Sequence, residues 1–168
     1  MVGRQGNVKV VVGEHLPAFA DDALVGHVGH LLEEARDGDR LERGVVLIAP
    51  GGRHLQLRKA GGQYFAVVVD GPPVNRHKPS VDVLFRSTAD CAGRDALAIM
   101  LTGMGDDGAR GMKQLHDRGV RTLAQDEKTC AVFGMPMEAI RLNGVDEVLP
   151  LSQVAMAITR FDRGGAVE

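Results

Sequence analysis

Two carboxylates in a glycine-rich turn, Asp106 and Asp107, are the side chains of this sequence whose placement most strongly suggests chemistry. An apolar run over 96–101 stops just before Gly103, and a segment typical of a helix follows Gly108. In parallel α/β sheets, ligands and catalytic groups gather at the carboxyl ends of the strands. An aspartate at such an end either caps the N-terminus of the next helix or acts as a catalytic carboxylate.

A histidine in an equivalent place is the natural partner for that carboxylate. His15 follows the β-branched run 8–12 and precedes a proline turn. If two strand ends lie side by side, the imidazole comes within hydrogen-bonding distance of Asp107. Such a pair is the orienting half of a hydrolase triad, in which the carboxylate fixes the tautomer and the histidine is the general base. Spacing alone, however, favours a surface histidine and a helix-capping aspartate.

A triad also needs a nucleophile, and no residue of the chain stands out as one. None of the three serines follows a strand on a glycine-flanked elbow. We expect Ser80 to cap a helix, Ser87 to lie inside that helix and Ser152 to begin another. Cys91 and Cys130 have no neighbours that would lower a thiol pKa. The nucleophile therefore stays unassigned.

The glycines of the same turn also fit another site, a dinucleotide-binding loop. Residues 103–108 follow the pattern G-x-G-x-x-G, and Asp126 stands where a ribose-binding acid is expected. Asp106 and Asp107, however, bring two negative charges to the place where a pyrophosphate approaches the helix N-terminus. We therefore do not favour this interpretation, and we predict no cofactor.

Metal binding is not favoured either. His27, His30 and Glu33 share one face if their segment is helical, but no fourth ligand and no HExxH motif accompany them. A solvated helix face is the better interpretation. His54 and His77 lie near glycines and prolines, in predicted loops, and His77 could line the mouth of a site.

Composition narrows the class of protein. The 168 residues are 44% hydrophobic and 25% charged, with a net charge of −2, as in an ordinary globular domain. No basic cluster and few aromatic side chains (one Tyr, five Phe) argue against nucleic-acid binding. We see no signal peptide and no apolar stretch of membrane-spanning length. The expected location is the cytoplasm, which also suits two isolated cysteines.

Strand and helix signals alternate along the chain. The expected strands are 8–12, 45–49, 96–101, 120–124 and 145–148, with a hairpin of 55–57 and 64–69 around Gly61-Gly62; the expected helices are 18–35, 80–92, 109–118, 136–141 and 151–161. This alternation predicts an α/β fold, a doubly wound and mostly parallel sheet with helices on both faces and an antiparallel edge hairpin. Residues 1–162 form one predicted domain, and 163–168 a tail.

Several segments in order resemble the catalytic domain of CheB-type chemotaxis receptor methylesterases. They are IAPGGRHLQL (48–57), DGPPVNRHKPSVDVLFRSTA (70–89), MLTGMGDDGARGM (100–112), LAQDEKTCAVFGMPMEAI (123–140) and GVDEVLPL (144–151). The resemblance implies a carboxylic ester hydrolase that removes methyl groups from chemoreceptor glutamates and deamidates certain glutamines, using a Ser-His-Asp triad. It places the catalytic Asp on Asp107 and the catalytic His on His15, and gives Met104, with Gly105, a part in shaping the oxyanion site.

The resemblance also implies partners and a difference from the family. The expected partners are the cytoplasmic helices of methylated chemoreceptors and, beyond these, a receiver domain or another chemotaxis protein. Relatives carry their nucleophilic serine on a glycine-rich GxSxGG turn after a first central strand, which we do not find before Val8. We therefore expect that strand, the serine and the receiver domain to be missing, and the chain alone to be weak or inactive. The alternative is a non-catalytic domain that binds the receptor or a signalling partner.

Overall fold

The computed structural model describes residues 10–12, 31–42 and 44–164, which form three sheets and five helical segments. One parallel sheet has the strand order β1-β3-β2, and a second has the order β6-β7-β8. The strands are β1 (Val10–Val12), β2 (Leu31–Glu34), β3 (Val45–Ile48), β6 (Leu97–Met100), β7 (Arg121–Gln125) and β8 (Glu147–Leu149). Between the two sheets in sequence, β4 (His54–Ala60) and β5 (Gln63–Val69) make the antiparallel hairpin around Gly61-Gly62.

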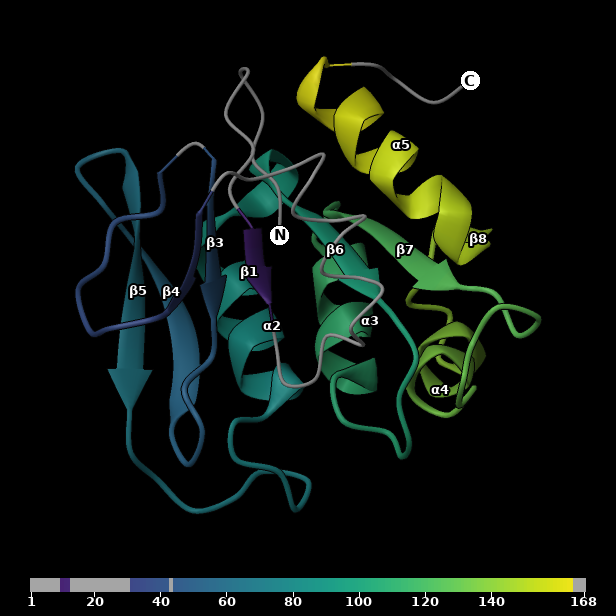
Figure 1. Ribbon diagram of the computed structural model, residues 1–168, viewed down its shortest axis with the longest axis horizontal. Coiled ribbons are helices and arrows are strands. Elements are labelled where there is room, and N and C mark those ends of the chain that lie inside the picture. The colour runs from purple at the N-terminus through teal and green to yellow at the C-terminus, as the bar shows by residue number, and fades with distance from the viewer. Residues whose placement is uncertain (1–9, 13–30, 43, 165–168) are drawn as a thin grey trace.

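Helices cover both faces of the second sheet. The helical segments are α2 (Val81–Cys91), the short 3-10 turn η1 (Gly93–Asp95), α3 (Ala109–Asp117), α4 (Met135–Arg141) and α5 (Leu151–Asp162). Alternate residues of β6 point to opposite faces, as in any strand. Ala98 and Met100 join the core under α2, α3 and α4, whereas Leu97 and Ile99 join the core under α5. In Figure 1, α5 (yellow) lies apart from α2, α3 and α4.

The mixed α/β fold with parallel strands and an antiparallel hairpin is as the sequence predicts. Apart from β4, expected to end at 57 but ending at Ala60, the described helices and strands match the expected ones to within about two residues, with one exception. Leu31–Glu34, expected to end a helix, is a strand that pairs in parallel with β3, from Leu31↔Val45 to Glu34↔Ile48. The pairing with a buried neighbour overrides the local helix preference of this segment. The rest of that predicted helix, 18–30, lies outside the described residues.

The parallel strands form two sheets rather than the single sheet predicted. Over the described ranges, β1 pairs only with β3, and β6 pairs only with β7. The two sheets are nevertheless neighbours, because Val46 of β3 and Leu97 of β6 share one core (Figure 1). Among the strands that the structure describes, β1 and β6 are thus each the end strand of a sheet.

Two glycines let α2 and α3 approach closely. A Cβ at Gly108 would lie 2.6 Å from Cγ1 of Val81, and one at Gly111 would lie 2.7 Å from Cβ of Phe85. Gly108 also has a φ of 85°, a left-handed conformation that favours glycine. This contact brings the N-termini of both helices to one place, where the candidate site lies.

Candidate active site

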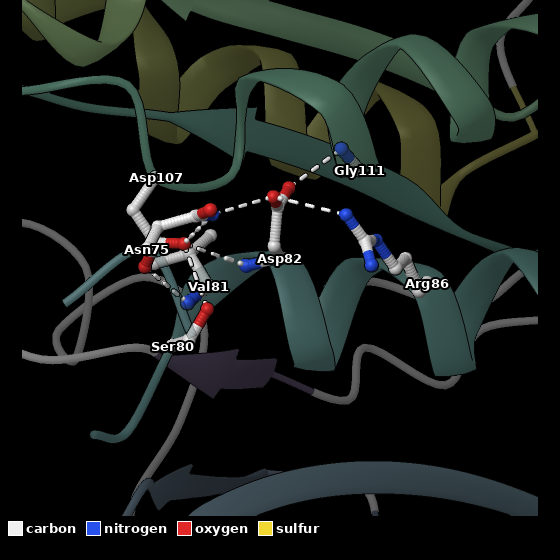
Figure 2. A network of polar contacts seen from close by, with 7 residues as sticks. All are labelled: Asn75, Ser80, Val81, Asp82, Arg86, Asp107 and Gly111. Atoms are coloured by element: carbon white, nitrogen blue, oxygen red, sulfur yellow. Dashed lines mark hydrogen bonds and ion pairs between the residues drawn. The ribbon is translucent and has the colours of Figure 1, made fainter. Parts of the chain in front are cut away.

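Asp107 is buried at the N-terminus of α2, with 3% of its surface exposed. Its Oδ1 accepts hydrogen bonds from Ser80 Oγ (2.7 Å), Asn75 Nδ2 (2.9 Å) and the backbone N–H of Asp82 (3.3 Å). Its Oδ2 accepts one from the backbone N–H of Val81 (2.7 Å). Figure 2 shows the donors converging on this carboxylate.

These contacts correct two sequence predictions about helix caps. Asp107 does not cap α3, the helix that follows it, since α3 begins after Gly108 with no side-chain cap. It caps α2, where its negative charge is favoured by the helix dipole. Ser80 stands at the N-cap position of α2 as predicted, but its hydroxyl makes no capping bond and donates to Asp107 instead.

Asp82, a residue that sequence reasoning missed, is a second buried carboxylate beside the first. Its side chain is completely buried, and it accepts hydrogen bonds from Asn75 Nδ2 (2.7 Å) and the backbone N–H of Gly111 (2.7 Å). Arg86 lies 3.4 Å away, one turn along α2. An acidic residue in the first turn of a helix is usually a solvated charge that the helix dipole stabilises, so no local pattern indicates this burial.

The two carboxylates exchange caps between the two helices. Asp107, which precedes α3, bonds the first N–H groups of α2; Asp82, which belongs to α2, bonds an N–H in the first turn of α3. The anion position at the α3 N-terminus is therefore already taken by Asp82. This occupancy argues further against a dinucleotide-binding loop at 103–108.

His54 bonds both ends of the loop that connects β5 to α2. His54, expected in a loop, is the first residue of β4 and is buried. Its Nδ1 accepts from the backbone N–H of Ser80 (3.2 Å), so its Nε2 carries the proton and donates to the carbonyl of Pro72 (2.9 Å). His54 is thus a structural histidine, whereas His77 is exposed near the tip of the loop.

Met104 and Gly105 occupy the turn between β6 and Asp107. Met104 is 80% exposed, and Gly105 has a φ of 91°. Gly103 fixes the base of this turn, because its N–H donates to Val132 (3.0 Å) and its carbonyl accepts from Met135 (2.8 Å). The turn therefore presents a methionine side chain to solvent three residues before the buried aspartate.

Asp107 keeps room for one further donor. An ionised carboxylate offers about four acceptor sites, two on each oxygen. Among the described residues, three donors contact Oδ1 but only Val81 contacts Oδ2. An imidazole N–H is one donor that could complete the set. His15 lies outside the described residues, so its pairing with Asp107 stays a prediction.

The described thiols and serines offer no activated nucleophile. Ser80 is bonded to Asp107, and Ser87 is held inside α2 by the carbonyl of Leu84 and the N–H of Leu57. Ser152 is exposed in the first turn of α5. Burial raises the pKa of both cysteine thiols, Cys91 and Cys130, which disfavours the reactive thiolate.

The helix face expected to carry His27, His30 and Glu33 is not supported at Glu33. Glu33 lies in β2, not in a helix, while His27 and His30 are outside the described residues. Within the ranges given above, no group of His, Cys, Asp and Glu side chains is arranged to hold a metal ion. In the same residues, no helix is both long and apolar enough to cross a bilayer.

Comparison with known proteins settles the family. The sequence pattern of the family described as CheB methylesterase matches residues 3–158. The chain belongs to the CheB methylesterase family. The family's protein-glutamate methylesterase/protein-glutamine glutaminase 2 from Dechloromonas aromatica is 54% identical over 158 residues, which cover 92% of this chain and 44% of the relative. Another such enzyme, from Chromobacterium violaceum, is 59% identical over 155 residues, with 90% and 44% covered.

A solved structure of the same family has the same fold. The crystal structure of the Thermotoga maritima CheB methylesterase catalytic domain superposes with a TM-score of 0.78 at 31% identity, covering 91% of this chain and 83% of that one. This CheB-family chain spans less than half the length of the curated relatives it matches. The resemblance found in the sequence is thus confirmed, and it concerns the catalytic part of those proteins.

Proposed function

We propose that this chain carries the acid and the base of a chemotaxis methylesterase, which hydrolyses glutamate methyl esters and deamidates glutamines on chemoreceptors. The observation that supports the proposal is Asp107. It is buried, held by four donors, and has an acceptor site left on Oδ2. A carboxylate so fixed is suited to orient an imidazole, which is the role of the acid in a hydrolase triad.

In this proposal His15 donates one ring N–H to Asp107 Oδ2. The bond fixes the tautomer, so that the other ring nitrogen is free to take a proton from the attacking hydroxyl. It then gives that proton to the leaving ester oxygen or amide nitrogen, which departs as methanol or ammonia. The turn of Met104 and Gly105 helps to shape the site for the oxyanion of the tetrahedral intermediate. The substrate is a side chain on the cytoplasmic helices of a receptor, which places the chain in the cytoplasm.

The attacking hydroxyl does not come from the three serines, because Ser80 and Ser87 are engaged and Ser152 is exposed on α5. We propose that the hydroxyl comes from a further strand that pairs with β1 and β6, the end strands of the two parallel sheets. A triad that lacks its nucleophile keeps only a small part of its catalytic power. The chain alone is therefore weak or inactive towards methyl esters.

A non-catalytic role is the second candidate. The observation that favours it is the same engagement of the serines, since a domain without a nucleophile can still bind a receptor. In that case the chain binds receptor cytoplasmic fragments but accelerates no ester hydrolysis.

The test measures hydrolysis of two substrates. Methanol release from a methylated receptor fragment should stay close to background, whereas the activated ester p-nitrophenyl acetate should be hydrolysed slowly by the oriented imidazole. His15→Asn and Asp107→Asn should each remove most of this slow reaction, and Asp106→Asn, a matched change at an exposed neighbour, should not.

Each alternative outcome is informative. Equal p-nitrophenyl acetate hydrolysis by all three variants and the parent chain contradicts the catalytic pair, and receptor binding without turnover then supports the second candidate. Rapid methanol release by the chain alone contradicts its predicted weakness and reveals a nucleophile within it.

A further inference from the structure

Asn75 donates hydrogen bonds from one amide nitrogen to both buried carboxylates. Its Nδ2 lies 2.7 Å from Oδ2 of Asp82 and 2.9 Å from Oδ1 of Asp107 (Figure 2). An amide nitrogen carries two protons, so each carboxylate receives one. Two negative groups that share a buried site repel each other, and a donor that bonds both of them offsets this repulsion. Asn75 is that donor.

Asn75 is also the one described donor to Asp107 that lies outside the N-terminus of α2. The other three come from Ser80, Val81 and Asp82, which follow one another in the chain. These three bond both oxygens of the carboxylate from one helix end. The amide of Asn75 adds a bond to Oδ1 from the loop between β5 and α2, a separate segment of the chain.

The contacts of Asn75 close a ring through both helices. From Asp107 the ring runs to Asn75, on to Asp82, then to the N–H of Gly111 in α3, and along α3 back to Asp107. The backbone of Asp107 and its side chain are thus tied to the same amide. A shift of α3 relative to α2 is opposed at the carboxylate itself.

The backbone at Asn75 is built for this side chain. Val74 and His77 exchange two backbone hydrogen bonds, of 3.0 and 2.9 Å, that close a tight turn. Asn75 and Arg76 at its centre have φ values of 50° and 70°. Asparagine tolerates this left-handed region better than most residues, and glycine adopts it freely. Only asparagine of the two supplies an amide.

We infer that Asn75 is a positioning residue for the acid of this site. It acts through Asp107 and fixes the direction in which Oδ2 offers its remaining acceptor site. This inference rests on the proposed function, because it assigns the amide a part in orienting His15.

The test uses Asn75→Gly, which keeps the positive φ and removes the amide. The matched control is Arg76→Gly, the same substitution at the adjacent exposed turn residue. Two readouts are compared at a temperature where every variant is folded: the NMR shift of the Val81 amide proton, which reports on Oδ2 directly, and the His15-dependent hydrolysis of p-nitrophenyl acetate.

The expected result is a displaced Val81 resonance and a fall of about tenfold in kcat at unchanged KM, because a small misplacement of a catalytic group is costly. Arg76→Gly should leave both readouts as in the parent chain. A loss of stability alone moves neither readout below the unfolding transition. If Asn75→Gly does not fold, Asn75→Ser, which keeps one donor, should show a smaller fall in kcat.

The outcomes separate this inference from the proposed function. If Asn75→Gly leaves the Val81 resonance or kcat unchanged, and Asp107→Asn still removes most of the reaction, the positioning role of Asn75 is wrong and the proposed function stands. If Asp107→Asn hydrolyses p-nitrophenyl acetate as fast as the parent chain, His15 and Asp107 are not a catalytic pair. Asn75 then has no role in the reaction, even if its substitution moves the Val81 resonance.

Discussion

Replacing Asp107 by Asn should destabilise the fold strongly, although the two side chains have nearly the same shape. The amide oxygen can replace only one of the two carboxylate oxygens. In the better orientation it faces Ser80, Asn75 and the N–H of Asp82, and the new NH₂ group faces the N–H of Val81. One buried donor then has no acceptor, and two donors confront each other.

The size of the effect follows from these contacts. An unsatisfied buried N–H costs about 1–3 kcal/mol, and three bonds that change from charged to neutral acceptors lose roughly 0.5 kcal/mol each, which gives about 3 kcal/mol. For a domain of this size that corresponds to a fall in Tm of about 10 °C. The exposed neighbour provides the control, because Asp106→Asn should change the free energy of unfolding by less than about 0.5 kcal/mol.

Urea denaturation followed by far-UV circular dichroism measures both variants. The slope with denaturant should be unchanged, since the surface exposed on unfolding is the same. If Asp107→Asn lowers the free energy of unfolding by no more than Asp106→Asn does, the carboxylate does not hold the four donors, and the argument for a fixed catalytic acid fails.

Three further changes probe the same region. Gly111→Ala places a Cβ 2.7 Å from Cβ of Phe85 and 3.0 Å from Oδ1 of Asp82. It should lower the free energy of unfolding by about 2 kcal/mol, measured by thermal unfolding. Gly51→Ala is the control and should be close to neutral, because a Cβ there meets nothing within 4 Å. Ser80→Ala removes a 2.7 Å bond to Asp107 and should cost about 2 kcal/mol, with exposed Ser152→Ala as the control in the same unfolding assay. The hydrogen bond from Lys78, and after it the N–H of Gly71, lower the pKa of Asp70. The ion pair of Lys78 and Asp70 therefore stabilises the fold at pH values above the ordinary carboxyl pKa, and this contribution is lost as the pH falls through the lowered pKa. Lys78→Met should therefore raise the pKa of Asp70 towards its ordinary value in an NMR titration, and an unchanged pKa would show that the ion pair does not form in solution.

Local pattern was enough to predict most of the elements. The apolar runs at β3, β6 and β7 and the turn residues around the hairpin have clear signals, and so do the helices α2 to α5. The prediction was wrong at 31–34, because Leu31–Glu34 has helix-favouring side chains and becomes a strand only by pairing with β3. That pairing depends on a neighbour more than ten residues away, which no local rule contains.

The sequence predicts that Asp107, if it caps a helix, caps α3, whereas in the structure it caps α2. Capping rules connect a residue with the helix that follows it in the chain. Here the close approach at Gly108 and Gly111 places a second helix end nearer to the carboxylate. Asp82 was missed for the same reason, because its burial is caused by α3 and not by its own helix.

The exchange of caps makes the structural role of Asp107 compatible with the catalytic role proposed for it. A capping aspartate at the start of its own helix would be half solvated, and its direction would be set by that helix alone. Asp107 is instead held by the other helix and by Asn75, so its direction is fixed by the packing of α2 on α3. The same bonds that make it a cap leave one acceptor site on Oδ2 and exclude water from the rest of the carboxylate. A triad acid needs this combination, because it must hold one imidazole N–H in one direction without itself taking up the proton. Capping is therefore the means by which this fold would fix a catalytic acid, and the two interpretations of Asp107 do not compete.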